Sequence, residues 1–238
     1  MKSPNYNYEK EIPAGFYDKI YQRKTGVRYC WHDLKFRAVA AHLPRAKRLL
    51  DIGCGPGTFV GNYLRSIDCL GIDFSAAQIQ YANRRYADDS HRFSTQPIAS
   101  LIESGERFDA ITMIELVEHL AAADAARLFA QARELLSIDG ILIVTTPNYR
   151  SLWPLIERGV NLVSPVSYEQ QHVNKYCRDR LITELLEAGY RSVRVTTAVG
   201  FAPFAAVFGP GPVRWLHALE TRLAHLGCGH LLLAVARP

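Results

Sequence analysis

Long hydrophobic runs and paired cysteines are two features that this 238-residue sequence lacks. No apolar stretch reaches the roughly 20 residues of a membrane-spanning helix, so we expect no transmembrane segment. The first eleven residues, MKSPNYNYEKE, hold no apolar signal-peptide core, so we expect a cytoplasmic protein. The cysteines are odd in number and show no CxxC spacing, which excludes a disulfide framework and a thiolate zinc site. They are Cys30, Cys54, Cys69, Cys177 and Cys228.

Glycine and proline are not enriched either, at 16 and 12 residues. No repeat of roughly 20–50 residues is visible, so collagen-like, low-complexity and solenoid classes are excluded. The chain is 48% hydrophobic and 21% charged, as globular proteins usually are. Its length suits one large domain, and we expect residues 1–238 to form a single one.

Positive charge gathers near the start of the chain, although the net charge of the whole is only +5. Residues 1–48 hold eleven Lys and Arg against four Asp and Glu, whereas the remainder is slightly acidic. A basic arm of this kind fits phosphates, an anionic membrane surface or an acidic substrate. The alternative is a charged face that meets only solvent, and the sequence leaves both open.

Short apolar runs alternate with helical patterns from residue 48 onward. Apolar runs predict strands at 48–52, 68–73, 91–94, 108–113, 140–145, 193–197 and 231–235. Helical periodicity predicts helices at 58–65, 76–86, 122–136 and 177–188, with Ser75 as an N-cap and Gly189 closing the last. Strands separated by helices indicate a mostly parallel sheet, which binds ligands at the carboxyl ends of its strands.

Two stretches are too long for simple connections between these elements. They are residues 147–176 and residues 198–229. The second contains the run GFAPFAAVFGPGP and then an apolar helical face made of Trp215, Leu216, Leu219, Leu223 and Leu226. We expect this face to pack on the sheet. The alternative is a lid or an interfacial patch for a lipid-like substrate.

The strongest chemical signal is the glycine-rich segment LLDIGCGPGTF at 49–59, between a predicted strand and a predicted helix. Glycines let backbone N–H groups approach a ligand closely, at a helix N-terminus that favours negative charge. The dinucleotide pattern GxGxxG would need a glycine where Thr58 stands. Asp51 lies inside the segment, and Asp73 ends the next strand, where a carboxylate can accept hydrogen bonds from ribose hydroxyls.

The chain resembles the class I S-adenosylmethionine (SAM)-dependent methyltransferases in four motifs. These are DIGCGPG at 51–57, GIDFS at 71–75, FDAITMIE at 108–115 and DGILIVTTPN at 139–148. The resemblance implies a Rossmann-like, doubly wound α/β sheet of seven strands, mostly parallel with one antiparallel strand near the C-terminus. It also implies an N-terminal helical cap (1–45), a SAM-binding core (46–146), a first insert (147–176) and a C-terminal half (177–238) that contains the apolar insert (198–229).

SAM is the cofactor that the resemblance implies. Gly53, Gly55 and Gly57 would line its methionine end, Asp73 would hold the ribose, and Phe74 would pack on the adenine. The chain reads Gln96-Pro97-Ile98 where the family often has an acidic residue beside the adenine amine, so it departs from the family there. The expected cofactor-binding residues are Asp51, Gly53, Cys54, Gly55, Gly57, Asp73, Phe74, Ile98 and Met113, and Asp51 could instead serve to fix the loop.

Candidate catalytic residues follow the fourth predicted strand. Glu115, Glu118 and His119 have the spacing i, i+3, i+4, which predicts that all three lie on one side of a helical turn. His172 lies in the first insert. His119 could act as a general base, because histidine titrates near neutral pH, with Glu118 and His172 as further catalytic candidates. Alternatively, Glu115, Glu118, His119 and His172 could bind a divalent metal that lowers the pKa of an acceptor hydroxyl.

The E-x-x-E-H pattern with a downstream histidine resembles two branches of the superfamily. One is the ubiquinone-biosynthesis O-methyltransferases, which act on a prenylated phenol. The other is the metal-dependent small-RNA 2′-O-methyltransferases, in which all four positions would carry the metal. A third interpretation is that Glu118 and His119 only cap the following helix and line the cofactor pocket.

Aromatic residues are frequent in residues 15–39, a block that resembles the helical cap over the cofactor and acceptor. We place Tyr17, Tyr21 and His32 near the ligands. The alternative is that these aromatics belong to the core, as aromatics at helical spacing often do.

We expect a SAM-dependent methyltransferase that acts on a hydroxyl of a small or lipid-linked acceptor, namely an isoprenoid, glycolipid or polysaccharide precursor. A peripheral membrane contact through residues 200–226 fits such an acceptor. RNA 2′-O-methylation is the main alternative, although no added RNA-binding module is visible and nucleic acid is less favoured. N-methylation and SAM binding without turnover also stay open, because fold alone does not fix the acceptor.

Overall fold

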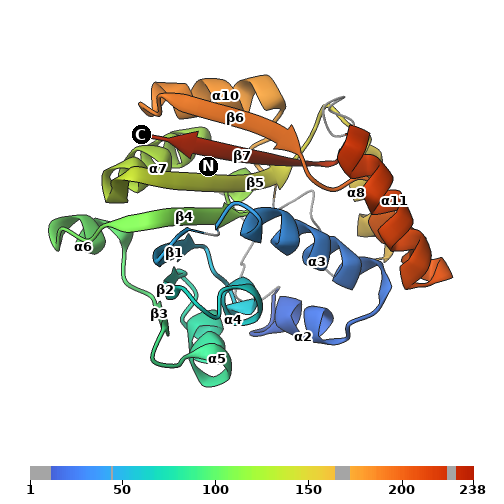
Figure 1. Cartoon of the computed structure of the whole chain (residues 1–238), viewed down its shortest axis with the longest axis horizontal. Helices are drawn as coiled ribbons and strands as arrows, with labels where there is room; N and C mark the ends of the chain where they lie inside the picture. Colours follow the sequence, from blue (N-terminus) through green and yellow to red (C-terminus); the bar gives the residue numbers. More distant parts are fainter. Residues whose placement is uncertain (1–11, 44, 164–171, 224–228) are drawn as a thin grey trace.

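The computed structural model describes residues 12–43, 45–163, 172–223 and 229–238. Within them, seven strands form one sheet in the order β3-β2-β1-β4-β5-β7-β6 (Figure 1). The strands are β1 Arg48–Ile52, β2 Asp68–Ile72, β3 His91–Ser94, β4 Phe108–Ile114, β5 Leu136–Pro147, β6 Ser192–Thr197 and β7 Leu231–Arg237. Strands β1 to β5 pair in parallel, and β7 pairs antiparallel with both β5 and β6. The predicted fold class is therefore confirmed.

Helices cover both faces of this sheet. The α-helices are α2 Phe16–Gln22, α3 Gly26–Ala40, α4 Thr58–Tyr63, α5 Ala76–Tyr86, α6 Ile98–Glu103, α7 Ala122–Leu135, α8 Trp153–Val163, α10 Arg178–Glu187 and α11 Pro210–Leu223. Two 3₁₀ segments, η1 Val117–His119 and η2 Ala202–Phe208, complete the described elements. Figure 1 shows α3 and α11 at the end of the sheet where β7 begins, which is the carboxyl end of the parallel strands.

The two faces of the sheet bury separate cores because successive side chains of a strand point to opposite sides. In β1, Leu50 and Ile52 join the core under α7 and α10. Leu49 joins the core under α3, α4 and α5. A third, smaller cluster ties α3 to η2 and α11 and includes Leu34, Val199 and Val213. The cap helix α3 is thus packed against the sheet and against the second insert.

Three elements differ from the sequence-based expectation. Strand β5 begins at Leu136, four residues before the predicted start, and Leu136 pairs with Phe108 of β4 across a register irregularity. Helix α6 was not expected, because six residues are too few to show a helical period. Helix α8 lies inside the insert that was predicted only as a long connection.

The prediction that the apolar face of residues 215–226 packs on the sheet is wrong for most of its length. Leu216 packs against the small cluster, but Trp215, Leu219 and Leu223 are exposed. Helix α11 rests on η2 beyond the sheet, so only one edge of it meets the protein. Leu226, like Cys228, lies outside the described residues. In the described part of the chain, no helix has both the length and the hydrophobicity needed to cross a bilayer.

Candidate active site

The glycine-rich loop leaves β1 and enters α4 through three residues with positive φ, at Gly53 (73°), Gly55 (52°) and Gly57 (73°). A Cβ at Gly53 would come within 2.9 Å of Leu116, and one at Gly57 within 2.8 Å of Phe93. A Cβ at Gly55 would meet no described atom within 4 Å. The loop is therefore tightly packed at its two ends and open at its centre, as a backbone cradle for a ligand requires.

Asp73 holds this loop in place from the end of β2. Its carboxylate accepts hydrogen bonds from the backbone N–H of Gly55 at 2.9 Å and of Ser75 at 2.9 Å. Ser75 caps α5 by accepting the N–H of Gln78, as predicted. The neighbouring Phe74 is 67% exposed, so its ring lies on the surface beside the loop. The proposed ribose contact of Asp73 and adenine contact of Phe74 stay predictions.

Asp51 is buried in β1 under the loop. It accepts a hydrogen bond from Thr112 Oγ1 at 2.6 Å. Burial raises the pKa of Asp51 to about 7, outweighing the Thr112 hydrogen bond, and the charge of Asp73 raises it further. Asp51 is thus bound to Thr112 of β4, and both its cofactor contact and its role in fixing the loop stay predictions.

The remaining expected cofactor residues lie near the same edge in different settings. Cys54 is buried beside Gly71, and burial raises the pKa of its thiol well above the usual range. Ile98 opens α6 and is partly buried. Met113 is fully buried in the core under α7 and α10. Their contacts with the cofactor stay predictions.

The turn after β4 differs from the predicted helical turn. Glu115 adopts φ 49°, a left-handed conformation that is uncommon outside glycine. The turn that follows, η1, has only three residues. The expectation that Glu115, Glu118 and His119 share one side of a helical turn is therefore wrong. The left-handed conformation of Glu115 interrupts the helical path between it and η1.

Glu115 is held by helix α3 of the cap. Its carboxylate accepts hydrogen bonds from Lys35 Nζ and, at 3.3 Å, from Trp31 Nε1. Burial works against its charge, but the Lys35 ammonium lowers the pKa of Glu115 to about 2. Trp31 in turn packs on Trp153 of α8, with ring centroids 5.2 Å apart. Glu115 therefore belongs to an ion pair between the cap and the sheet.

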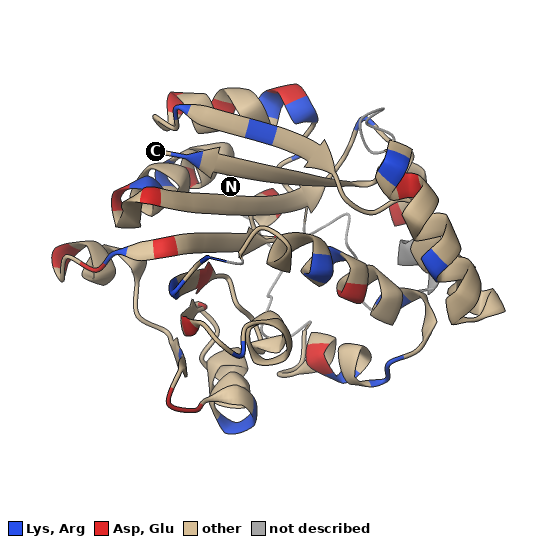
Figure 2. Cartoon of the chain, viewed as in Figure 1, with Lys and Arg blue, Asp and Glu red and all other residues tan. Residues whose placement is uncertain are grey.

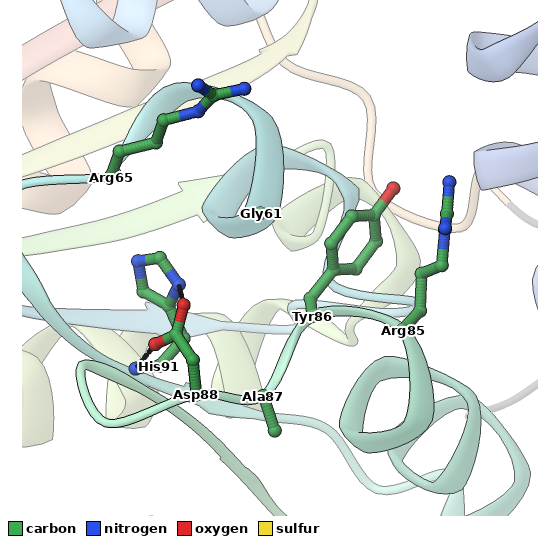
Figure 3. A pocket seen from close by; sticks show the side chains of 7 residues that line it. All are labelled: Gly61, Arg65, Arg85, Tyr86, Ala87, Asp88 and His91. Carbon is green, nitrogen blue, oxygen red and sulfur yellow. Dashed lines mark hydrogen bonds and ion pairs between the residues drawn. The ribbon is translucent and has the colours of Figure 1, made fainter.

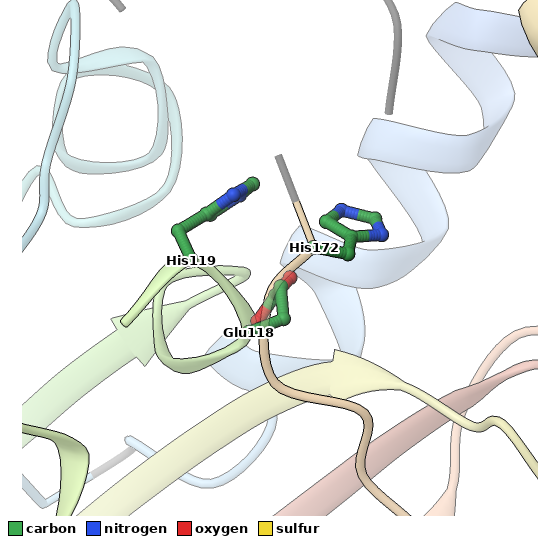
Figure 4. A group of neighbouring side chains, drawn as sticks. All are labelled: Glu118, His119 and His172. Carbon is green, nitrogen blue, oxygen red and sulfur yellow. The ribbon is translucent and has the colours of Figure 1, made fainter. Parts of the chain in front are cut away.

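Glu118, His119 and His172 do come together (Figure 4). One ligand-type atom from each lies within 4.8 Å of the others, and the two imidazole centroids are 5.1 Å apart. Figure 4 shows Glu118 and His119 on η1 and His172 on a separate segment. That segment is joined to η1 by the hydrogen bond from Asn174 N to Glu118 O, at 3.0 Å. Glu115 lies outside the group.

Glu118 is fully buried, and only one of its two carboxylate oxygens has a hydrogen-bond partner among the described residues. Its Oε2 accepts a hydrogen bond from Thr146 Oγ1 at 3.0 Å, whereas Oε1 has no partner among the described residues. Burial raises the pKa of Glu118 to about 7, against the opposing charge of His172. A buried carboxylate oxygen without a donor suits a proton or a cation, so the group fits a metal ion.

His172 is oriented by two residues of the first insert. Its Nδ1 lies 2.5 Å from Glu157 Oε1 and 2.9 Å from Tyr149 Oη, and Tyr149 also donates to Glu157. Burial disfavours the charged imidazolium, but the Glu157 hydrogen bond and the charge of Glu118 raise the pKa of His172. A carboxylate on one ring nitrogen is the usual support of a metal-binding or proton-transferring histidine, which then works through the other.

The aromatic cap is mostly structural. Tyr21 is buried and donates to Tyr63 at 2.9 Å, so the alternative that it belongs to the core fits better than a ligand contact. His32 lies between Tyr17 and Phe36, each ring 5.8 Å away, and burial lowers the pKa of His32 to about 3. His32 and Tyr17 stay candidates for ligand contact.

Four residues that serve the site carried no signal in the sequence. Lys35 and Asp18 lie on cap helices, and Tyr149 and Glu157 lie in the first insert. Asp18 is buried and accepts hydrogen bonds from Thr58 Oγ1 at 3.0 Å and Tyr81 Oη at 2.8 Å. It therefore fastens α2 to the first residue after the glycine loop.

A cavity of about 390 Å³ lies away from this site (Figure 3). Its lining comes from the ends of α4 and α5 and from His91 at the start of β3. These residues lie near the amino ends of parallel strands β2 and β3. The glycine loop and η1 instead follow the carboxyl ends of β1 and β4. Asp88 also lines the cavity, with its Oδ2 3.1 Å from His91 Nδ1. The cavity is not part of the candidate active site.

Comparisons with known proteins identify the family of this chain. A family model described as a methyltransferase domain matches residues 21–195. The chain is 33% identical, over 53% of its length, to a ubiquinone biosynthesis O-methyltransferase of Azorhizobium caulinodans and covers 49% of that protein. The chain thus spans about half the length of the curated relatives it matches.

Solved structures agree on the fold. A SAM-dependent methyltransferase of Thermotoga maritima aligns with a TM-score of 0.67 and 18% identity, over 92% of this chain and 95% of that one. A magnesium protoporphyrin IX methyltransferase of Synechocystis, solved with bound S-adenosylhomocysteine, aligns with a TM-score of 0.59 and 16% identity, over 89% and 85%. The glycine loop, the strand order and the matched family model lead to one conclusion: the chain belongs to the class I SAM-dependent methyltransferases, whose cofactor is SAM.

Proposed function

We propose that this chain transfers the methyl group of SAM to a hydroxyl of a small or lipid-linked acceptor, such as an isoprenoid, glycolipid or polysaccharide precursor. The observation that carries the proposal is the grouping of Glu118, His119 and His172 beside the glycine loop. Leu116, two residues before Glu118, packs against Gly53, so the two parts of the site are in contact. The matched relatives named as O-methyltransferases support a hydroxyl acceptor.

The reaction requires alignment and removal of one proton. The acceptor oxygen attacks the sulfonium methyl in line, the carbon–sulfur bond breaks and S-adenosylhomocysteine leaves. The hydroxyl proton passes to a base, and His119, which is partly exposed at the site, is the residue we assign to it. Glu118 and His172 complete the group, with Glu157 orienting the His172 ring.

A divalent metal ion is the other way to ionise the acceptor. Glu118, His119 and His172 would hold it, and the unpartnered Oε1 of Glu118 is the observation that favours this fit. When bound, such an ion would lower the pKa of the acceptor hydroxyl. Magnesium or a similar ion suits a carboxylate, although two imidazoles also fit manganese or zinc.

The cofactor would lie over the open centre of the glycine loop. Gly53, Gly55 and Gly57 would face its methionine end, and Asp73 would organise both the loop and the ribose side. Phe74 would cover the adenine, which agrees with its exposed position beside the loop. The helix α4 that follows adds a favourable N-terminal dipole for the cofactor carboxylate.

A lipid-linked acceptor agrees with the exposed apolar surface of the second insert. Val207, Phe208 and Trp215 are 71%, 80% and 70% exposed, and they lie on η2 and α11. Figure 2 marks basic positions along α11. Arg214 belongs to this helix and is exposed. Apolar residues flanked by basic ones suit an anionic membrane surface. We therefore include a peripheral membrane contact, with a cytoplasmic location, in the proposal.

Transfer of a tritiated methyl group from SAM tests the acceptor. The purified protein is incubated with host cell extract, with and without EDTA, and label is counted in lipid, small-molecule, RNA and protein fractions. Label in the lipid or small-molecule fraction supports the proposal, and sensitivity to EDTA there favours the metal over His119 acting alone. Label in RNA would show that the acceptor is RNA, and label on a nitrogen atom of the product would show N-methylation. Either result would contradict the proposed acceptor. Label in no fraction would favour a SAM-binding protein without turnover.

A further inference from the structure

Glu115 has the position in the sequence of a fourth metal ligand, yet in the folded chain it is bound to something else. The E-x-x-E-H pattern with a later histidine implies four ligands if this chain follows the metal-dependent branch. Glu118, His119 and His172 come within 4.8 Å of one another, and Glu115 lies outside that group. The folded chain therefore differs from the four-ligand pattern in the position of one carboxylate, that of Glu115.

Lys35 is the residue that holds Glu115. Its side chain is only 3% exposed, and its ammonium forms an ion pair with Glu115 Oε2. The ammonium also lies 5.1 Å from the centroid of the Phe36 ring. An ammonium buried to this degree cannot readily exchange its carboxylate for water, because an unpaired buried charge is costly. Any metal ion that recruited Glu115 would have to leave Lys35 uncompensated.

Two further features fix Glu115 in this arrangement. Trp31, one turn before Lys35 on α3, donates a hydrogen bond to Oε1 of Glu115 at 3.3 Å. The backbone at Glu115 is left-handed, with φ 49°, whereas Glu118 lies within the following turn. The two carboxylates therefore have different partners. Glu115 is bound to the cap helix α3, whereas Glu118 lies beside His119 and His172.

We propose that Lys35 is a specificity-determining residue that keeps Glu115 out of the metal group, so that Glu118, His119 and His172 alone supply the protein ligands. This inference rests on the metal-assisted form of the proposed function. Three protein ligands leave coordination positions for acceptor oxygen or water, as in catalytic rather than structural metal sites. One fewer carboxylate also makes the site less negative, so it would bind a divalent ion more weakly than a four-ligand site.

Manganese binding to the full-length protein tests the proposal without any assay of activity. Mn²⁺ is titrated by calorimetry and by electron paramagnetic resonance into the wild type, Lys35→Met, Glu115→Gln and the double variant Lys35→Met/Glu115→Gln. Lys47→Met, which changes an exposed lysine, is the matched control. Circular dichroism and SAM binding confirm that each variant is folded.

The proposal predicts that Lys35→Met binds Mn²⁺ about tenfold or more tightly than the wild type, because Glu115 is released to become a ligand. The double variant should return to the wild-type affinity, and Lys47→Met should not differ from it. Because Lys35→Met leaves the Glu115 carboxylate unpaired and could fail to fold, the double variant Lys35→Met/Glu115→Gln, in which neither charge is left unpaired, provides a second test. Both it and Glu115→Gln should leave Mn²⁺ affinity within about threefold of the wild type, since Glu115 is not a ligand.

A tenfold loss of Mn²⁺ affinity in Glu115→Gln would show that Glu115 is a ligand and would overturn the proposal. Unchanged affinity in a folded Lys35→Met would also overturn it, as would the absence of Mn²⁺ binding in every folded protein. None of these results affects the proposed methyl transfer, which is measured separately with labelled SAM in the presence of EDTA.

Discussion

Several carboxyl groups of this protein are buried, and the pKa of Asp51 shows the effect of that burial. Asp51 lies under the glycine loop in β1, where burial raises its pKa to about 7. The unfolded chain carries an ordinary aspartate with a pKa of about 4. Between these values the folded protein holds a proton that the unfolded chain releases, so the free energy of unfolding from this group falls as pH rises.

Asp51→Asn should remove that pH dependence, because asparagine keeps the neutral shape and can still accept the Thr112 hydrogen bond. We expect the wild type to lose about 2–4 kcal/mol between pH 4 and pH 7.5 relative to the variant. Urea denaturation of both proteins across this range measures the difference. Parallel curves for the two proteins would show that the pKa of Asp51 is the same in the folded and unfolded states.

Asp73 organises the glycine loop by accepting two backbone hydrogen bonds. Asp73→Ala should weaken SAM binding about tenfold to a hundredfold, because two backbone N–H groups lose a charged acceptor. Calorimetric titration with SAM measures the loss, and Asp124→Ala, which changes a carboxylate on α7, is the control. Unaltered affinity in Asp73→Ala would mean that the carboxyl end of β2 does not meet the cofactor.

Local sequence was enough to predict these loop residues but not their partners. The glycines, Asp51 and Asp73 are recognisable because the phosphate- and ribose-binding loops of parallel sheets need such residues directly after a strand. The Lys35–Glu115 pair joins residues 80 positions apart, and Asp18 and Thr58 are 40 apart. Contacts of that kind depend on how α2 and α3 fold back over the sheet, and no short motif encodes this.

At the scale of whole elements, the second insert is where the structure departs most from expectation. An apolar helical face usually indicates burial, but α11 begins only after η2 has covered the adjacent surface of α3. Much of its apolar face is left exposed. The strands were easier to predict, because β1 and β3 match their expected bounds and the others differ mainly at their ends. Burial on both faces makes a parallel strand a continuous apolar run.

If η2 and α11 contact a membrane, adding charge to them should prevent it. We predict that Phe208→Glu/Trp215→Glu loses most of the binding to vesicles of phosphatidylcholine and phosphatidylglycerol, measured by co-sedimentation, because two exposed apolar anchors become acidic. Ile138→Glu is the matched control, since Ile138 is 93% exposed on β5. Equal binding by the double variant and the wild type, or none by the wild type, would remove the membrane from the proposed function.

At the scale of the whole molecule, the candidate functional residues gather at one edge of the sheet. The glycine loop follows β1, Asp73 follows β2, and Glu115, Glu118 and His119 follow β4, so all lie at carboxyl ends of parallel strands. His172 reaches them from the first insert. The sequence predicts this edge through the alternation of its strands and helices and through its motifs. The packing of the two inserts had no comparable pattern.

The most direct test of the account compares His119→Ala with the wild type in transfer of labelled methyl from SAM, using the fraction that accepts label. Turnover should fall about a hundredfold or more in the variant, because a proton acceptor is lost, while SAM affinity by calorimetry stays within about twofold. His42→Ala, at an exposed position after α3, should match the wild type in both. Unchanged turnover in His119→Ala would contradict the assignment of the active site to the turn after β4.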